Sequence, residues 1–397
     1  MMVLQRLCER HSLGPVYILG SCLWQDRGLV IWHPPGFYGH ERIICFTAQV
    51  APFVKSGVQV TILTRFQGCA AVITLNRPHR YNATDLETIL QIAEFLNELR
   101  QNDKIKKVIL TSDHPKAFCA GGDIHAAYIA MKNNDLSQGK VFFDAEYQLV
   151  YDLATYPKPV ISLVNGLCFG GGMGLSMHNR FRIITENAVL GMPETIIGFF
   201  PDVGASYRFA QFPKAWANFY GLTGHNIHLS HALRWNMADY FVPATILPEL
   251  LTALCMTNGN DSKAIEQFTS VAPDVPIFGQ SWVEEIFQKP LLEIFEYLKN
   301  CPNHEAKKTL NDLQLRSPLS LAITAKLLGM APLLDLKKAL TLDRVLAENF
   351  MHNPDFQEGI RAQVIDKDRQ PKWLYNMLDI NDEMLQDFFI PTYTDCE

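Results

Sequence analysis

The sequence is poor in charge and has no strong excess of either sign. Only 19% of its 397 residues are charged, and the formal net charge is −6. A weakly acidic chain lacks the basic surface that general nucleic-acid binding requires, so no direct nucleic-acid partner is expected. Hydrophobic residues make up 48%, which is typical of a globular protein. The length allows one large domain with an appended segment.

Closely spaced cysteine pairs are missing. The nine cysteines are scattered, and no two of them form a Cys-x-x-Cys pair. An odd number at irregular spacing favours neither a disulfide framework nor a zinc site, and a reducing compartment is the simplest interpretation. Cys119 and Cys168 each lie just before a glycine-rich turn, where a thiol could act as a nucleophile. We expect both to be small buried residues instead.

Long apolar runs are missing as well. No run approaches the roughly 20 residues needed to span a bilayer, so a soluble protein without a membrane partner is predicted. Residues 1–57 form an unusual N-terminal extension. Its first 25 residues contain Arg6, Arg10 and His11 but only one acid, Glu9, and they include a largely apolar stretch. The pattern is compatible with a mitochondrial targeting segment and equally with a plain extension, and less so with a secretory signal.

What the sequence does contain is a pair of glycine-rich turns, Ala120-Gly121-Gly122-Asp123 and Gly170-Gly171-Gly172-Met173-Gly174. Glycine has no Cβ, so its backbone N–H can approach a ligand closely. Two such N–H groups that converge on one oxygen form an oxyanion hole, which stabilises charge developing on a carbonyl. Two carboxylates, Glu194 and Asp202, follow the second turn. Backbone donors with carboxylates indicate acyl or enolate chemistry.

Two nucleotide-binding patterns compete with this interpretation. Neither turn contains the GxxxxGK[ST] motif of a P-loop. A dinucleotide-binding fingerprint requires GxGxxG in the first strand–helix unit, with an acid about 20 residues further on, and that arrangement cannot be read here. Phosphate binding is therefore not predicted for either turn.

Apolar periodicity predicts an α/β fold. Strand-like runs are expected at 58–62, 71–75, 107–111, 159–164 and 181–185, and helices at 84–96, 142–155 and 173–179. From about residue 210 helices dominate, one of them over 333–351, and residues 388–392 belong to a tail. We therefore divide the chain into the extension 1–57, an α/β core over 58–260 and a mainly helical region over 261–397.

The motifs together resemble the crotonase superfamily, the enoyl-CoA hydratases and isomerases. The segments that carry the resemblance are NRP (76–78), AFCAGGD (117–123), KPV (158–160), NG (165–166), GGGMGLS (170–176), PE (193–194) and GFFPDVG (198–204). The resemblance implies a crotonase-type spiral of β-β-α units with a helical C-terminal region. It also implies an acyl-CoA thioester substrate, whose oxyanion is held by the backbone N–H groups of Gly122 and Gly171.

One departure from the superfamily bears on the reaction. Hydratases similar to this chain carry two glutamates, one three residues after the oxyanion glycine and one in the Pro-Glu turn. The first of these positions is Gly174 here, whereas the second is Glu194. Addition of water to a double bond then lacks its second acid/base group, so ordinary hydratase activity is not expected.

Further segments resemble the 3-hydroxyisobutyryl-CoA hydrolase family. They are FFDAEY (142–147), MPET and FPDVG (within 192–204), DFQEGIRA (355–362) and IDKDRQPKW (365–373), and the last two favour this family over plain hydratases. The resemblance implies hydrolysis of 3-hydroxyisobutyryl-CoA in valine degradation, in the mitochondrial matrix. It implies no metal or redox cofactor, since coenzyme A is part of the substrate, and it is compatible with a homo-oligomer.

The resemblance also implies roles for individual residues. Gly122 and Gly171 would hold the thioester oxygen, and Glu194 would act as nucleophile or general base, two alternatives that the sequence does not separate. Asp202 and Glu146 would position the 3-hydroxyl and assist proton transfer. The other substrate-binding positions that the resemblance implies are Ala120, Gly121, Asp123 and Gly170.

Purely structural interpretations of the acids, and other functions, stay open. Asp202 could form only an Asx-turn, Glu146 a solvated helix face, and Glu194 a partner for a helix N-terminus. We expect His178 to be packed and hydrogen-bonded rather than a base. One alternative function is a crotonase-fold isomerase, for which one carboxylate can suffice. Another is a hydrolase-like structural subunit of a mitochondrial ribosome.

Overall fold

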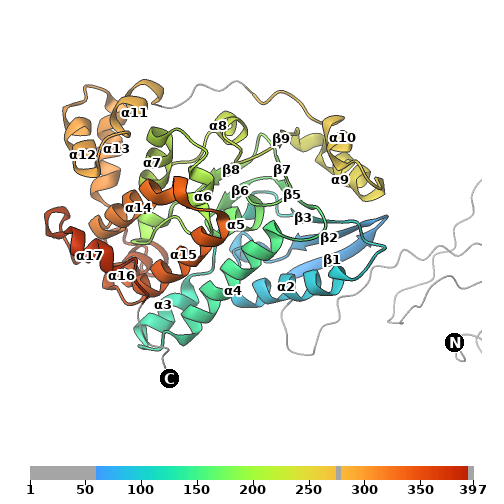
Figure 1. Cartoon of the computed structure of the whole chain (residues 1–397), viewed down its shortest axis with the longest axis horizontal. Helices are drawn as coiled ribbons and strands as arrows, with labels where there is room; N and C mark the ends of the chain where they lie inside the picture. Colours follow the sequence, from blue (N-terminus) through green and yellow to red (C-terminus); the bar gives the residue numbers. More distant parts are fainter. Residues whose placement is uncertain (1–59, 274–278, 392–397) are drawn as a thin grey trace, which may run out of the picture. The chain divides into compact units, whose positions relative to one another are not determined.

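The computed structural model describes residues 60–273 and 279–391. The fold repeats a β-β-α unit, and the strands of these units form two sheets (Figure 1). The larger sheet has six strands in the order β1-β2-β3-β5-β7-β9, in which β1 and β2 are antiparallel and the other neighbours are parallel. Its strands are β1 (Ile62–Gln67), β2 (Ala70–Leu75), β3 (Lys107–Ser112), β5 (Val160–Val164), β7 (Phe181–Ile184) and β9 (Tyr240–Phe241).

The second sheet positions the glycine-rich turns. It consists of three parallel strands, β4 (Ala117–Cys119), β6 (Leu167–Phe169) and β8 (Val189–Gly191), in the order β4-β6-β8. Cys119 of β4 pairs in register with Cys168 of β6. Both turns begin directly after these strands, and the carboxyl ends of neighbouring parallel strands meet at one edge. The pairing therefore brings the two turns together.

Helices cover the sheets and form most of the regular structure in the rest of the described chain. In the first half they are α2 (Leu86–Arg100), α3 (His125–Lys132), α4 (Ser137–Ala154), α5 (Gly171–Ser176), the 3-10 helix η2 (Glu194–Ile197) and α6 (Ala205–Phe209). The next are α7 (Lys214–Thr223), α8 (Leu229–Arg234), α9 (Leu247–Met256), α10 (Asp261–Glu266), α11 (Gln280–Ile286) and α12 (Leu291–Asn300). The last are α13 (His304–Gln314), α14 (Pro318–Met330), α15 (Leu336–Met351), α16 (Pro354–Ile360) and α17 (Asp382–Asp387).

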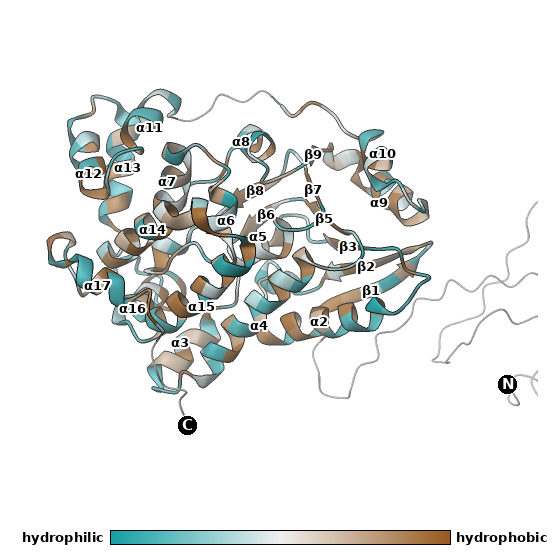
Figure 2. Ribbon diagram, viewed as in Figure 1, coloured by the Kyte–Doolittle hydropathy of each residue, from teal (hydrophilic) through white to brown (hydrophobic). Residues whose placement is uncertain are grey.

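The core lies on both faces of the larger sheet. Along β3, Val108 and Leu110 belong to one buried cluster, and Ile109 between them belongs to the other, as strand alternation requires. Helices such as α2 and α4 show both apolar and polar turns in Figure 2, so one side of each can pack inward. None of the helices in the described part of the chain combines the length and the apolar character that crossing a bilayer demands.

Most predicted elements are found, with shifted ends. The strands at 71–75, 107–111, 159–164 and 181–185 are confirmed, and Asp85 caps α2 by accepting the Thr88 N–H at 2.9 Å. The predicted helix 142–155 begins earlier, at Ser137, and the predicted helix 173–179 runs instead from Gly171 to Ser176. The helix expected from residue 333 begins at Leu336, because Asp335 caps it by accepting the Lys338 N–H.

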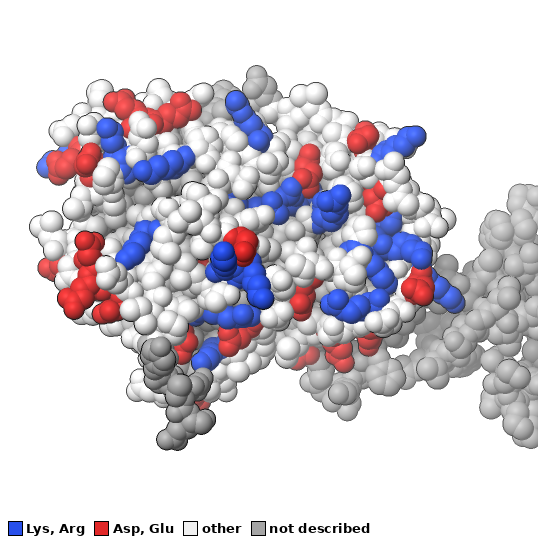
Figure 3. Space-filling model, in the orientation of Figure 1, with Lys and Arg blue, Asp and Glu red and all other residues white. Residues whose placement is uncertain are grey.

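The division of the chain at residue 260 stays a prediction. In the described residues the last strand, β9, ends at Phe241, and only helices follow it. Charged residues of both signs are interspersed over the face shown in Figure 3. The predicted extension 1–57 lies outside the described residues.

Candidate active site

The two glycine-rich turns lie against each other. A Cβ built on Gly170 would be 3.9 Å from the Gly121 Cα, and one built on Gly171 would be 3.1 Å from the Gly122 nitrogen. Within the described residues, neither the Gly122 N–H nor the Gly171 N–H donates to a protein acceptor. The two predicted oxyanion donors are therefore neighbours with unused hydrogens, which is the arrangement that an oxyanion hole needs.

Positive backbone angles explain two of these glycines. Gly121 has a φ of 118° and Gly170 a φ of 47°, in the region that L side chains rarely adopt. A Cβ on Gly170 would also lie only 2.5 Å from Oε1 of Glu194. The conformation of the turns and the close approach of a carboxylate therefore both require glycine here.

The loop between β2 and α2 fixes the first turn. Ala120 N–H donates to the Tyr81 carbonyl at 3.0 Å, and Thr84 N–H donates to the Gly121 carbonyl at 2.9 Å. Asp123 N–H donates in turn to the Thr84 carbonyl at 2.7 Å. The backbone of Ala120 and Gly121 is thus held in place by hydrogen bonds to the loop between β2 and α2.

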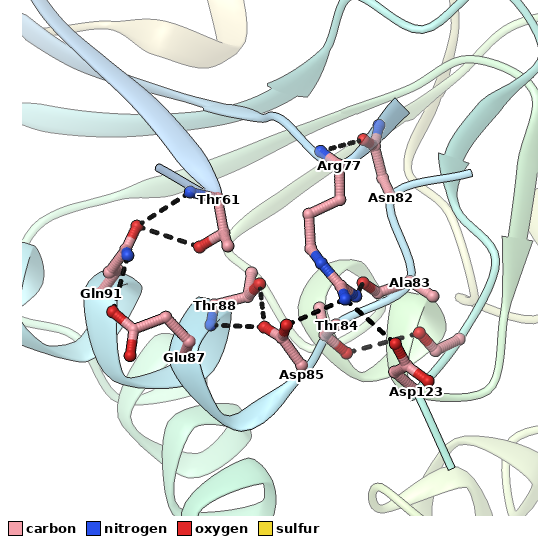
Figure 4. A network of polar contacts seen from close by, with 11 residues as sticks. Thr61, Arg77, Asn82, Ala83, Thr84, Asp85, Glu87, Thr88, Gln91 and Asp123 are labelled. Carbon is pink, nitrogen blue, oxygen red and sulfur yellow. Dashed lines mark hydrogen bonds and ion pairs between the residues drawn. The ribbon is translucent and has the colours of Figure 1, made fainter. Parts of the chain in front are cut away.

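Arg77 locks this loop with its charge (Figure 4). Its guanidinium lies 2.9 Å from the Asp85 carboxylate and 3.0 Å from the Asp123 carboxylate, and it also donates to the Ala83 carbonyl. The side chain of Asp123, predicted to bind substrate, is therefore committed to Arg77. A contact between Asp123 and the substrate stays a prediction. In the structure the Asp123 side chain anchors the turn through Arg77.

The Arg77→Met substitution should destabilise the protein. Arg77 is 9% exposed at its side chain, and its loss leaves Asp85 and Asp123 without their cation. We expect the free energy of unfolding to fall by about 2–3 kcal/mol, somewhat less than for a fully buried pair because Asp85 is partly exposed. Chemical denaturation measures this change.

Arg361→Met is the control for the Arg77 substitution. Arg361 also pairs with several carboxylates but is more exposed, so its loss should lower the free energy of unfolding clearly less than the loss of Arg77. Equal stability losses in the two variants would contradict the anchoring role of Arg77.

Two glutamates border the paired turns. Glu146 comes from α4, and its Oε1 occupies the place that a Cβ on Gly171 would take. Glu194 is the first residue of η2 and reaches Gly170. Glu146 is 5% exposed and Glu194 8%, and Oε2 of Glu194 has no hydrogen-bond partner among the described residues. Buried carboxylates that lie beside these glycines and lack a pairing cation in the described part of the chain make this place a candidate for chemistry rather than for structural pairing.

Asp202 completes this group of acids. Its Oδ2 accepts a hydrogen bond from the Tyr147 hydroxyl at 2.8 Å, and it is 5% exposed. Tyr147 follows Glu146 on α4, so one helix contributes a carboxylate and the phenol that orients another carboxylate. The structure thus brings together the glycine turns, Glu146, Glu194 and Asp202.

Burial shifts the ionisation of all three acids. It raises the pKa of Glu146 and of Glu194 well above the usual range, and the neighbouring charge of Asp202 raises both further. Burial also raises the pKa of Asp202 to about 7, although the hydrogen bond from Tyr147 opposes the shift. Carboxyl groups with raised pKa values can exchange protons near neutral pH, as general acids and bases must.

The stability of the protein should depend on pH because the pKa of Asp202 is raised. A carboxyl whose pKa is raised on folding stabilises the native state below its unfolded pKa, and this contribution disappears as pH rises through the folded value. Folding raises the pKa of Asp202 from 3.8 to about 7. The stability of wild type relative to Asp202→Asn should therefore fall between these two pH values and stay constant above pH 7. Calorimetric melting of both proteins at a series of pH values tests this. A constant difference would contradict the shift.

Three residues that the sequence analysis expected to be structural are buried: His178, Cys119 and Cys168. His178 is buried, its Nε2 lies 2.9 Å from the Val203 carbonyl oxygen, and burial lowers its pKa well below the usual range. Cys119 and Cys168 are fully buried. Burial raises the pKa of Cys119 to about 12 and that of Cys168 further, so neither supplies a thiolate at neutral pH. The predictions of a packed histidine and of small buried cysteines are confirmed.

Gly174 lies in a position with no room for a carboxylate. A Cβ there would be 2.9 Å from the Val203 Cβ and 3.0 Å from Cγ2 of Val150. The glutamate that similar hydratases carry at this place would collide with the core. The second acid of the hydratase pair is therefore excluded by packing as well as by sequence.

Comparison with known proteins decides the family. The family model for enoyl-CoA hydratase/isomerase matches residues 70–389, which is most of the chain. The chain belongs to the enoyl-CoA hydratase/isomerase family. Within this family it groups with the 3-hydroxyisobutyryl-CoA hydrolases, as the sequence motifs predicted.

Three relatives show how far the similarity extends. The "3-hydroxyisobutyryl-CoA hydrolase, mitochondrial" of Rattus norvegicus is 35% identical over 372 residues, covering 90% of this chain and 96% of the relative. The "small ribosomal subunit protein mS47" of Schizosaccharomyces pombe is 33% identical over 336 residues, covering 81% and 78%. A carnitinyl-CoA dehydratase structure from Mycobacterium thermoresistibile has a TM-score of 0.79 at 28% identity, covering 85% and 98%. The predicted crotonase-type fold is confirmed.

The structure shows one further buried acid close to the site, which the sequence analysis did not name. Asp343, on α15, is fully buried, and its Oδ2 accepts the Gly204 N–H at 2.7 Å. Asp343 lies far along the chain from the glycine turns and outside every motif used above. A charged residue at a core-facing position of a helical pattern was the available signal.

Proposed function

We propose that this protein hydrolyses the thioester of a 3-hydroxyacyl-CoA, most specifically 3-hydroxyisobutyryl-CoA, to the free acid and coenzyme A. The observation that carries the proposal is the group of three buried carboxylates, Glu146, Glu194 and Asp202, around the unused N–H groups of Gly122 and Gly171. The names of the hydrolase relatives give the substrate. Packing around Gly174 argues against ordinary hydratase activity.

The thioester carbonyl would bind with its oxygen between the Gly122 and Gly171 N–H groups. Negative charge develops on that oxygen when the carbonyl carbon is attacked, and preorganised donors stabilise it by about 3 kcal/mol each. Coenzyme A leaves as the thiol, after a proton is delivered to its sulfur. The remaining predicted substrate contacts are with the backbone of Ala120, Gly121 and Gly170.

Glu194 would drive the attack in one of two ways. As a general base it takes a proton from water while the water oxygen bonds to the carbonyl carbon. As a nucleophile it bonds to that carbon itself and forms an anhydride, which water then hydrolyses. Its raised pKa makes the ionised form a stronger base than a solvated glutamate. Glu146 and Asp202 would hold the 3-hydroxyl, because a neutral carboxyl donates and an ionised one accepts a hydrogen bond.

A single turnover in ¹⁸O-labelled water separates the two routes. With enzyme in excess over substrate, attack on the anhydride carbonyl of Glu194 leaves label in the Glu194 carboxyl group, which mass spectrometry of its peptide detects. Direct attack by water places the label in the product acid alone. Label in Glu194 is expected if the anhydride forms. Glu186→Gln is the control, because Glu186 is an exposed acid eight residues before Glu194. Label that persists in the Glu194 peptide of this variant does not come from non-specific exchange at Glu186.

The relative named as a ribosomal protein supports a second candidate function. A chain similar to mS47 could serve as a structural subunit of a mitochondrial ribosome, and it would then need none of the buried acids. Gel filtration of cell extract separates the candidates, because the proposed enzyme should elute well below the size of a ribosomal subunit. Migration only with a large ribonucleoprotein particle would favour the structural role.

Localisation and assembly belong to the same proposal. The hydrolase relative in Rattus norvegicus is named mitochondrial, and we propose the mitochondrial matrix for this chain, where valine degradation takes place. A homo-oligomer and the absence of any cofactor stay predictions. Retention of full activity after dialysis against a chelator is expected, because no step above uses a metal.

A further inference from the structure

Helix α15 brings a buried carboxyl group to the turn that follows Asp202. Asp343 is 0% exposed, and its Oδ2 accepts the Gly204 N–H at 2.7 Å. Its Oδ1 is also buried and has no hydrogen-bond partner in the part of the chain that the structure describes. Burying a carboxyl group with one oxygen unpaired costs free energy. A hydrophobic residue at this position would avoid that cost, so the acid must serve the turn.

The turn itself is strained. Val203 has a φ of 50° and Gly204 a φ of 75°, both in the left-handed region. For a β-branched valine this conformation is an outlier, and it persists only where the surroundings impose it, at a cost of about 1–3 kcal/mol. Such strain concentrates at functional sites.

Two side chains hold the turn from different elements. His178 approaches the Val203 carbonyl with Nε2 at 2.9 Å, and Asp343 accepts from the next residue, Gly204. Asp202, which precedes both, is bonded at its side chain by Tyr147. Its carboxylate is therefore oriented by α4, while the backbone that carries it is fixed by α15.

We propose that Asp343 is a positioning residue, whose side-chain oxygen holds the strained turn in the one conformation that presents Asp202 to the substrate. The inference rests on the proposed function, since it takes Asp202 as a substrate contact. It goes further in assigning a part of the site to the helical C-terminal region.

The role requires an acceptor oxygen and not a negative charge. Burial, and after it the charge of Asp202, raise the pKa of Asp343 well above the usual range, so a neutral carboxyl accepts the Gly204 N–H. Asparagine offers the same acceptor in the same volume, whereas leucine offers none. Asp343→Asn should therefore act like wild type, and Asp343→Leu should release the turn.

Hydrogen exchange measured by mass spectrometry, together with steady-state kinetics, tests this. In Asp343→Leu, exchange in a peptide spanning residues 200–207 should be at least about 10-fold faster, because the turn opens locally. Its kcat should fall about 10- to 100-fold with KM within about 3-fold, since misplacement of a catalytic group acts mainly on the transition state. Asp343→Asn should match wild type in both measurements.

Asn349→Leu is the matched control on the same helix. The Asn349 Nδ2 donates to the carbonyls of Phe388 and Ile390, both at 3.0 Å, and does not contact the Asp202 turn. This variant should lose stability as Asp343→Leu does, yet keep wild-type kcat and wild-type exchange in residues 200–207. A merely structural role for Asp343 would make the two leucine variants alike.

Two results would overturn the inference: unchanged exchange in Asp343→Leu, or an Asp343→Asn variant as impaired as Asp343→Leu. If neither the leucine variant nor Asp343→Ala folds, Asp343→Asn still decides, because it must fold and keep the slow exchange of wild type. If wild type hydrolyses no thioester, the proposed function fails, whereas the exchange data still show whether Asp343 holds the turn.

Discussion

Thioester hydrolysis by the Glu194→Gln variant is expected to fall in kcat by at least about 10³-fold, within the range for losing a general base or nucleophile. Glutamine fills the same volume beside Gly170 but neither accepts a proton nor forms an anhydride. KM should stay within about 3-fold, since the carboxylate acts in the transition state. Release of free coenzyme A thiol, followed with a thiol-reactive dye, measures the effect.

The same substitution should not destabilise the fold. Burial and the charges of Asp202 and Glu146 raise the pKa of Glu194, so the native state loses stability as pH rises above the usual glutamate value. Glutamine removes this cost, and the melting temperature at pH 8 should equal or exceed that of wild type. Glu348→Gln is the control and should keep full activity, because Glu348, on α15, forms only a partly exposed ion pair with Lys140 of α4. More than a tenth of wild-type activity in Glu194→Gln would contradict the assigned role.

Gly171→Ala should lower kcat by about 10²-fold or more, comparable with removal of one oxyanion donor. The added methyl would collide with Oε1 of Glu146 and lie 3.1 Å from the Gly122 nitrogen, so it fills the space where the thioester oxygen would bind. The backbone of Gly171 is helical, and alanine favours helix by about 1 kcal/mol over glycine. Loss of activity would therefore come from occupied space and not from a strained backbone.

Gly329→Ala is the matched control for this substitution. Gly329 is also helical, on α14, and a Cβ there meets no atom within 4 Å. The variant should keep wild-type kcat and gain a little stability. Normal kcat in Gly171→Ala, measured by the same thiol-release assay, would show that this pair of N–H groups is not the oxyanion hole.

The sequence predicted the four central strands of the larger sheet, β2, β3, β5 and β7, but misplaced β1 and missed β9 and the smaller sheet. Strands such as Lys107–Ser112 are long, β-branched and buried on both faces, so their composition alone identifies them. The strands β4, β6 and β8 are three residues each, too short for any periodicity to develop. Yet these short strands place the glycine turns side by side. What brings the site together was therefore the part of the fold that local patterns reveal least.

The residues of the candidate site also divide into those that local sequence patterns reveal and those that only the fold brings together. Glycine turns and nearby acids form motifs, so Gly122, Gly171 and Glu194 could be named from the sequence. Asp343 could not, because its partner Gly204 lies far away in the chain and only the packing of α15 joins them. Likewise the ion pair between Asp123 and Arg77 could not be predicted, because the two residues are 46 positions apart in the chain. Long-range pairing is what composition and spacing leave undetermined.

The rate of thiol release from 3-hydroxyisobutyryl-CoA, compared with that from isobutyryl-CoA, tests the central claim most directly. Glu146 and Asp202 are buried acids that the 3-hydroxyl would satisfy, and sites of this kind discriminate strongly against analogues that lack the bonding group. We predict turnover of the hydroxylated thioester, with kcat/KM at least about 100-fold above that of isobutyryl-CoA. Equal rates for the two thioesters, or no thiol release from either, would contradict the account.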